Sequence, residues 1–349
     1  MRTDRIVHVV HCHAAGEVGD VVVGGIAPPP GSSLWEQSRF IAQDGALRDF
    51  LLNEPRGGVF RHVNLLVPPF DPGADAGFII MEPEDTPPMS GSNSMCVAAV
   101  LLHTGQVSMT EPVTEVRLEA PAGTVRIEAS CHQGVVDSLS LINVPSFVER
   151  RGEVLSVPGV GDVRVDTAFG GDSFVIASAA DVGVEIRPEN AKRIAKIGRA
   201  LCDAANRQWR FEHPELPEWQ HFSFAYLVDE LKEIDGVLTS RNACAINPGK
   251  IDRSPTGTGC SALLALLHER GELAVGELYR ARSIIDSVFE CSIIDRAAVA
   301  DRPAVIPRIT GQAWVYGTSQ YYRDPSDPWP AGYRLTDTWP RFGVESTEG

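Results

Sequence analysis

Two segments of this chain, 166 residues apart, share one pattern at the start of an apolar helix. The first, residues 89–105, reads MSGSNSMCVAAVLLHTG, and the second, residues 255–271, reads PTGTGCSALLALLHERG. They align without a gap: each has a hydroxyl residue, a glycine and a second hydroxyl residue, then a run of small and apolar residues closed by a glycine. Because a helix that is apolar on nearly all sides is a buried helix, the repeat predicts two similar domains, each built around a central helix and related by a pseudo-twofold axis.

The start of each predicted helix is suited to binding an anion. The first amide N–H groups of a helix have no partner within the helix, and they lie at its positive end. Glycine at 91 and at 257 leaves room for an anion to approach these groups. We therefore expect Gly91, Ser92, Gly257 and Thr258 to hold the carboxylate of a small ligand between the two domains. Ser, Thr and Asn are also ordinary helix caps, but repetition at a fixed offset favours a functional interpretation.

The predicted strands and helices of the second half follow the order of those in the first half. The Gly- and Pro-rich segment Gly152–Asp162 is the best candidate for a linker between the halves. The sequence thus predicts an α/β (α+β) protein with one domain at residues 1–155 and a similar one at residues 156–323. The tail, residues 324–349, is expected to pack back against the first domain.

Composition narrows the choice of partner and compartment. The 349 residues carry 31 Lys and Arg against 46 Asp and Glu, a net charge of −15 that would repel nucleic acid and anionic membranes. The longest apolar runs fall far short of the ~18 residues of a membrane span, and we expect no signal peptide. Seven scattered Cys without a C-x-x-C pair indicate neither a disulfide framework nor a zinc site. We expect a reduced, cytoplasmic protein.

Histidine and cysteine side chains give little support for a metal or a reactive thiol. His11 and His13 would lie on one face of an extended segment around Cys12, but the sequence places no third ligand beside them, so no metal is expected. Cys96 and Cys260 follow helix starts, where the pKa of a thiol falls. One turn into an apolar helix, Cys260 is expected to pack rather than react.

Four motifs spread over nearly the whole chain resemble those of the proline racemase family, whose relatives include diaminopimelate epimerase. They are MSGSN at residues 89–93, DRSPTGTG at 252–259, NEPRG at 53–57 and AFGG at 168–171. The resemblance implies two α/β domains, each a curved sheet or barrel wrapped around its central helix, with the active site in the cleft between them. It implies a small amino acid as ligand and no cofactor. A homodimer is an assembly that the sequence allows.

The same resemblance assigns roles to individual residues. Ser90 and Thr256 occupy the two positions that flank the substrate's α-carbon from opposite faces. Asp252 becomes the partner of the substrate's ring nitrogen, a sensible pairing of a carboxylate with an ammonium group. The N-terminal loop, with His13 and Glu17, is expected to border the pocket.

The activity is decided by departures from the family pattern. The racemases and 4-hydroxyproline epimerases of the family typically have Cys at both flanking positions, which are Ser90 and Thr256 here, and the His that commonly follows Cys-Gly is Ser92. Inverting a stereocentre needs a base on one face and an acid on the other. Nothing in the second motif supplies a base to activate Thr256. The chain therefore resembles the trans-3-hydroxy-L-proline dehydratases of the family, which have Cys or Ser at the first position and Thr at the second.

Dehydration of this substrate needs only one active face. In trans-3-hydroxy-L-proline the hydroxyl lies on the same face as the α-hydrogen, so a group on that face can take the proton beside the leaving hydroxyl. Loss of water gives an enamine, which tautomerises to Δ1-pyrroline-2-carboxylate. We expect Ser90 to be the base, perturbed by burial and by the helix ends, and Thr256 to orient the substrate.

Two other functions remain open at this point. One is a hydroxyproline 2-epimerase or proline racemase, and the other, from a different class, is a catalytically inactive amino-acid-binding protein. Turnover in deuterated water separates the three. A dehydratase gives a pyrroline product, an epimerase gives deuterium-labelled epimer, and a binding protein gives neither.

Overall fold

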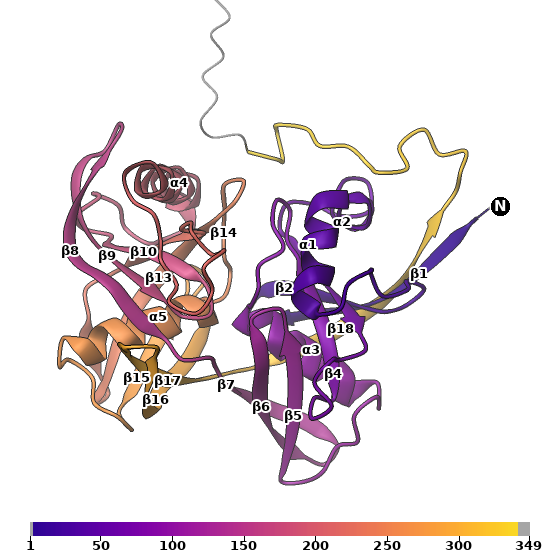
Figure 1. The fold of residues 1–349 in the computed structure, drawn as a ribbon, viewed down its shortest axis with the longest axis horizontal. Coiled ribbons are helices and arrows are strands. Elements are labelled where there is room, and N and C mark those ends of the chain that lie inside the picture. Colours follow the sequence, from indigo (N-terminus) through magenta and orange to yellow (C-terminus); the bar gives the residue numbers. More distant parts are fainter. Residues whose placement is uncertain (1–2, 341–349) are drawn as a thin grey trace, which may run out of the picture.

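The computed structural model describes residues 3–340 and consists of two similar halves, each a curved sheet around one helix. Figure 1 shows the halves side by side, joined where β7 and β17 meet. In the first half the strands run in the order β18, β1, β2, β3, β4, β5, β6, β7 around α3. Their bounds are β1 Arg5–Ala14, β2 Glu17–Gly24, β3 Arg61–Val67, β4 Ala76–Met81, β5 Val113–Ala120, β6 Gly123–His132, β7 Val135–Ile142, β18 Ala313–Arg323 and α3 Gly91–His103.

The second half repeats this arrangement around α5. Its strands run in the order β8, β9, β10, β11, β13, β15, β16, β17, with the short strands β12 and β14 both paired to β13. Their bounds are β8 Phe147–Val157, β9 Gly161–Phe169, β10 Ser173–Ser178, β11 Phe224–Val228, β12 Lys232–Ile234, β13 Val237–Ile246, β14 Lys250–Ile251, β15 Leu278–Arg282, β16 Val288–Val299, β17 Arg302–Gly311 and α5 Gly257–Glu269. The fold class predicted from the repeat is confirmed.

The two central helices are buried as predicted. Residues 91–102 of α3 and residues 257–267 of α5 are all buried, because neither sequence carries a polar stripe that water could solvate. Each helix lies inside the curve of its own sheet and forms, with the inward-facing strand residues, one continuous apolar core.

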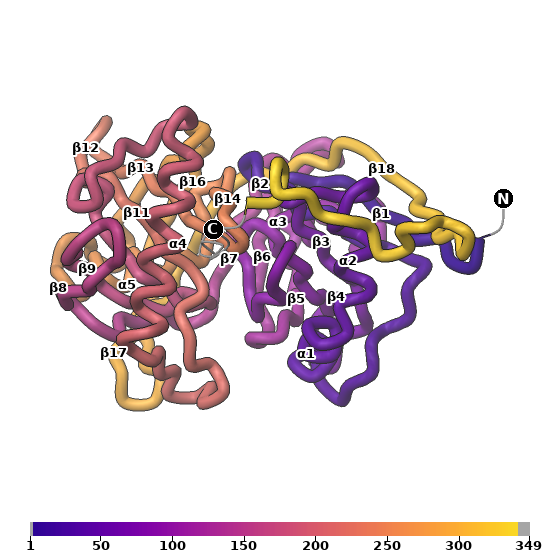
Figure 2. Tube along the Cα trace, turned by 90° about the horizontal axis from the view of Figure 1, so that it is seen from above, coloured from indigo at the N-terminus to yellow at the C-terminus, as the bar shows by residue number. Residues whose placement is uncertain are grey.

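Helices on the outside complete each half. Helices α1 (Leu34–Asp44) and α2 (Ala46–Leu52) cover the first sheet, and Gly45, at φ 65°, separates them. A 3-10 turn, η1 (Pro188–Asn190), leads into α4 (Ala191–Gln208), whose apolar side covers the second sheet. Figure 2 shows α4 lying along its half of the molecule.

Strand pairing departs from the predicted division of the chain. The segment Gly152–Asp162 is not a linker but the turn region of the β8–β9 hairpin, since Gly159 and Gly161 adopt the positive φ of turn residues. Strand β8 follows β7 but pairs in the second half, and β18 follows β17 but pairs with β1 in the first. We therefore propose domain boundaries near residues 146 and 312 rather than at 155 and 323.

The tail packs on the first half along its described part, to residue 340. Tyr333 pairs with Glu54, and Arg334 binds Asp49 and Glu84. In Figure 2 this segment runs along the first half toward the second. The remainder of the predicted tail, residues 341–349, lies outside the described residues.

Candidate active site

The N-termini of the two central helices meet between the halves. A Cβ placed on Gly91 would lie 3.0 Å from the Cα of Gly257, and one on Gly257 would lie 3.1 Å from the Cα of Gly91. Each distance is shorter than real Cβ contacts allow, so both positions need glycine for the helices to approach. The prediction of two facing helix ends is confirmed, but these glycines make room for each other as well as for a ligand.

The amides at these helix ends differ in how far the protein satisfies them. Ser90 caps α3, its Oγ accepting a hydrogen bond from the Asn93 amide at 3.4 Å. Thr256 makes no such cap on α5. Within residues 3–340, no side chain accepts a hydrogen bond from the amides of Gly257 or Thr258. These buried N–H groups are therefore available to a carboxylate.

The Ser90 hydroxyl is mainly an acceptor. The Asn93 side-chain Nδ2 donates to Ser90 Oγ at 2.9 Å, in addition to the amide of the same residue, and Ser92 Oγ lies 3.4 Å away. Across the described residues, no carboxylate or imidazole accepts a hydrogen bond from Ser90. The hypothesis from the sequence that Ser90 is the base thus finds no carboxylate or imidazole in contact that would take its proton, and the Ser92 hydroxyl is no base.

Asn93 is itself held from two sides. Asn64 Nδ2 donates to Asn93 Oδ1 at 2.8 Å, which orients the amide so that its NH2 faces Ser90 and, at 3.3 Å, His62 Nδ1. Burial, with the Lys250 ammonium nearby, lowers the pKa of His62 to about 3. His62 is therefore neutral, and its ring can accept from Asn93. Neither Asn64 nor His62 was predicted as a site residue: both lie on β3, outside the four motifs.

Thr256 has a carboxylate partner that the sequence analysis did not predict for it. Its Oγ1 donates to Asp252 Oδ2 at 2.7 Å, and the other oxygen of Asp252 accepts from the Ser254 amide at 2.8 Å. The expectation that no base lies near Thr256 is wrong. Four residues separate the two, and the turn between them, with Thr256 at φ 67°, brings the hydroxyl back to the carboxylate.

A buried ion pair, with one residue from each half, lies near Asp252. Lys250 Nζ on β14 donates to Glu17 Oε1 on β2 at 2.5 Å, and the Arg253 amide donates to Glu17 Oε2 at 2.7 Å. Burial opposes ionisation of Glu17, but Lys250 and then His62 lower the pKa of that carboxyl to about 2. Burial raises the pKa of Asp252 to about 7, and the Glu17 carboxylate contributes in the same direction. Glu17 was expected at the pocket, whereas Lys250 was not.

Two further buried carboxyls lie near the site. Burial raises the pKa of Glu82 well above its usual value and that of Asp172 to about 8. One oxygen of each, Oε2 and Oδ2, has no hydrogen-bond partner among the described residues. Glu82 approaches His62 at 3.6 Å, and Asp172 follows Gly171, where a Cβ would touch the side chain of Thr258. Burial therefore favours the neutral forms of both carboxyls, which can donate as well as accept hydrogen bonds.

The other candidates of the sequence lie elsewhere. His11 binds Asp20 and Ser319 on the outer face of the first sheet, and His13 stacks near Trp314. Of the residues that the structure describes, no group of three His, Cys, Asp or Glu is placed to hold a metal ion. The Cys residues near the helix starts, Cys96 and Cys260, are fully buried and pack in the core.

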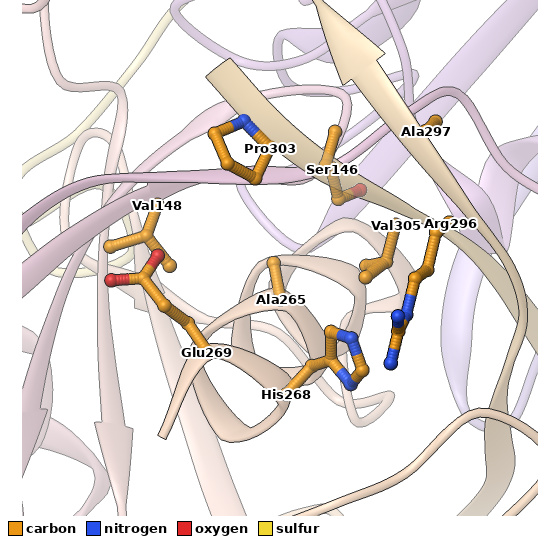
Figure 3. A pocket seen from close by; sticks show the side chains of 10 residues that line it. Ser146, Val148, Ala265, His268, Glu269, Arg296, Ala297, Pro303 and Val305 are labelled. Carbon is orange, nitrogen blue, oxygen red and sulfur yellow. The ribbon is translucent and has the colours of Figure 1, made fainter. Parts of the chain in front are cut away.

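Two cavities differ in their relation to the site. The cavity in Figure 3, of about 140 Å³, is lined by His268 and Glu269 at the far end of α5 and by Arg296 on β16. A helix rises ~1.5 Å per residue, so this cavity lies roughly 18 Å from the start of α5 and is not the site. A larger cavity of about 790 Å³ includes Lys250 and Arg253 in its wall. It opens beside the site, between the halves and the tail.

Along residues 3–340, no helix combines the length and the apolar character that crossing a bilayer requires.

Comparison with known proteins gives consistent matches over the chain. The family model for proline racemase matches residues 9–334. A probable proline racemase from Agrobacterium radiobacter K84, solved with bound carbonate, is 39% identical, with a TM-score of 0.91 over 95% of this chain and 98% of that one. A hydroxyproline epimerase from Agrobacterium vitis, solved with bound trans-4-hydroxy-L-proline, is also 39% identical, with a TM-score of 0.92 over 97% of each chain. A PhzF-family phenazine biosynthesis protein from Bacillus anthracis, 11% identical, has a TM-score of 0.54 over 92% of this chain and 99% of that one and shares the fold alone.

Proposed function

This chain belongs to the proline racemase family, and on that premise we propose that it dehydrates trans-3-hydroxy-L-proline to Δ1-pyrroline-2-carboxylate without a cofactor. The proposal rests on one observation: the two flanking hydroxyls differ in their hydrogen-bond partners. Thr256 donates to a carboxylate, whereas within residues 3–340 Ser90 contacts no carboxylate or imidazole that could take its proton. A racemase needs a proton acceptor on one face and a proton donor on the other. A site with one supported base fits elimination on a single face.

The substrate's charged groups fit the two ends of the site. Its carboxylate binds the free amides of Gly257 and Thr258 together with those at the start of α3. Its ring ammonium faces Asp252, whose two oxygens have capacity beyond the hydrogen bonds they already accept. This places the α-carbon between Ser90 and Thr256. The relative from Agrobacterium vitis holds a hydroxyproline, a ligand of the same ring class, which supports this choice of substrate.

Abstraction of the α-proton and departure of the 3-hydroxyl then form the enamine. Both events occur on the face that carries the α-hydrogen, because the hydroxyl is trans to the carboxylate. Burial favours the neutral form of both Glu82 and Asp172, and Asp172, with a pKa of about 8, adds a polar group near the site without adding charge next to the leaving group. The enamine leaves and tautomerises to the cyclic imine.

The test is turnover in deuterated water with three substrates in parallel: trans-3-hydroxy-L-proline, trans-4-hydroxy-L-proline and L-proline. We expect a pyrroline product, detected by reaction with o-aminobenzaldehyde, from the first substrate alone. Deuterium at Cα of an inverted 4-hydroxyproline or proline, with no pyrroline, would replace this proposal with the epimerase function. Binding of all three amino acids without product or exchange would favour a binding protein.

One specific observation favours the second candidate, a hydroxyproline epimerase. The chain is 39% identical to a structure described as such over nearly its whole length. The same experiment separates the two functions, because an epimerase retains the hydroxyl and incorporates deuterium at the inverted centre.

A further inference from the structure

The hydrogen-bond directions at Ser90 and Thr256 are opposite. Two donors of Asn93 point at Ser90 Oγ, so its lone pairs are engaged, and among the described residues the one acceptor within reach of its own proton is the Ser92 hydroxyl, at 3.4 Å, which is no base. Thr256 donates its hydroxyl proton to Asp252 Oδ2 at 2.7 Å, and across the part of the chain that the structure describes no group donates to its Oγ1. A hydroxyl becomes basic only when its proton has somewhere to go. In this respect the two positions of the repeat are not equivalent.

We propose that Thr256 removes the α-proton, that Asp252 takes up the hydroxyl proton of Thr256 as it does so, and that Glu17, from the other half of the molecule, positions Asp252 by accepting a hydrogen bond from the amide of the next residue, Arg253. The inference rests on the proposed dehydration and names its base. It reverses the assignment drawn from the sequence, in which Ser90 was the base and Thr256 oriented the substrate.

The proton balance closes within the pair. The Oγ1–H bond of Thr256 breaks and its proton goes to Asp252 Oδ2, while Oγ1 forms a new bond to the α-proton. The electron pair of the α-C–H bond becomes the C2–C3 double bond as the C3–O bond breaks. The proton held by Asp252 returns through Thr256 to the departing oxygen on the same face. Substrate becomes enamine and water, and both side chains end as they began.

Backbone geometry supports a dedicated role for Thr256. A β-branched residue seldom adopts a φ of 67°, and such strained positions concentrate at functional sites. The Thr256 amide donates to Ser254 Oγ at 3.0 Å, so the turn is fixed on its other side as well. The strained backbone aims Oγ1 at Asp252 instead of at the helix amides that a capping threonine would bind.

Glu17 acts on Asp252 by its charge and through the backbone next to Asp252, since the Arg253 amide donates to Glu17 Oε2 at 2.7 Å. The titratable groups around Asp252 are Glu17 on β2, Lys250 on β14 and Cys244 on β13. Lys250 holds Glu17 as an anion, and that anion adds to burial in raising the pKa of Asp252 to about 7. A carboxylate with this pKa can take a proton and give it back near neutral pH. Because Glu17 and Asp252 come from different halves, the relay is complete only when the cleft is assembled.

The first experiment compares exchange of the α-hydrogen in Thr256→Ala and Ser90→Ala, using each substrate labelled with deuterium at Cα. We expect Thr256→Ala to lose at least ~100-fold of the wild-type exchange, the usual scale of general base catalysis. Thr256→Ser should recover most of it, and Ser90→Ala should lose less than Thr256→Ala. A larger loss in Ser90→Ala would overturn the proposal and restore Ser90 as the base. Because exchange is measured on all three amino acids, this comparison is separate from the identity of the product.

The second experiment measures the positioning role of Glu17, and its main readout, an NMR titration, does not depend on turnover. The carboxyl carbon of Asp252, assigned by its disappearance in Asp252→Asn, is followed by ¹³C NMR as a function of pH. It should titrate near pH 7 in the wild type and at lower pH in Glu17→Gln, and the acid limb of kcat/KM should move in the same direction. Glu149→Gln is the matched control, because Glu149 also accepts from a threonine, Thr167 at 2.7 Å, but away from the cleft. Titration of Asp252 below pH 5 in the wild type, or no shift in Glu17→Gln, would overturn the role of Glu17.

Discussion

Gly91 and Gly257, one at the first turn of each central helix, pack against each other across the cleft with no side chain between them. A Cβ added to either glycine would lie within 3.1 Å of the Cα atom of the other glycine. The two positive helix ends are thereby brought to one place, where a single carboxylate can reach both.

Replacing Gly91 by Ala should therefore push the helix ends apart. We expect a loss of stability of about 1–3 kcal/mol, as for an overpacked core, together with a higher KM because the carboxylate amides separate. Urea unfolding and steady-state kinetics would measure the two effects. Gly24→Ala is the control, since its Cβ would lie at an ordinary 3.7 Å from His8, and it should change neither quantity. Full affinity for substrate in Gly91→Ala would argue against the shared carboxylate site.

The Glu17–Lys250 pair predicts strong coupling in a double-mutant cycle. Both side chains are almost wholly buried, so removal of one leaves the other charge unpaired. Glu17→Gln and Lys250→Met should each lower the free energy of unfolding by about 3–5 kcal/mol, and the double variant should lose much less than the sum. Losses that simply add would show that the two charges do not stabilise each other.

Asp172 predicts how stability changes with pH. In the unfolded chain its carboxyl ionises near pH ~4, whereas burial raises its pKa to about 8 in the folded protein. Between those values the folded state holds a proton that the unfolded state has lost, so this group's contribution to stability falls as the pH rises. Asp172→Asn should raise the free energy of unfolding by about 1–3 kcal/mol at pH 8 and by little at pH 4.

The measurement is Tm across this pH range by differential scanning calorimetry. Asp44→Asn, on the exposed end of α1, is the control and should leave the pH profile unchanged. A destabilised Asp172→Asn variant at pH 8 would mean that the folded protein holds Asp172 ionised.

Thr256 should lower the stability of the folded protein through its backbone conformation, while its hydroxyl is needed for activity. A φ of 67° is unfavourable for threonine but not for glycine, and the difference in free energy is about 1–2 kcal/mol. Thr256→Gly should therefore be more stable than Thr256→Ala, although both lack the hydroxyl and should be equally inactive. Equal stabilities of the two variants in urea would show that the backbone strain is absorbed elsewhere.

The repeat made the central part of the fold predictable. Two apolar segments opened by hydroxyl residues and glycine could hardly be other than buried helices, and their starts mark the site. The glycines were placed correctly, but their second role in helix contact depends on a partner 166 residues away, which a local pattern does not reveal.

What escaped prediction depends on contacts between distant segments. Lys250 lies in a turn-rich run with no motif of its own, and only the fold brings it to Glu17. The Thr256–Asp252 hydrogen bond depends on a positive φ at Thr256, which is common for glycine but rare for threonine, so the residue type does not predict it. The β8–β9 hairpin was mistaken for a linker because turn residues and linker residues have the same composition.

Strands β8 and β18 each pair in the half other than that of the strand before them, and this has a consequence for how the chain folds as it is synthesised. The first strand, β1, pairs along its whole length with the last, so that Arg5 lies opposite Arg323. Until nearly the entire chain has left the ribosome, the outer edge of β1 has no neighbour, while β8 already belongs to a sheet not yet synthesised. Contacts this distant in sequence close slowly. The half that emerges first is therefore the last to acquire its final strand.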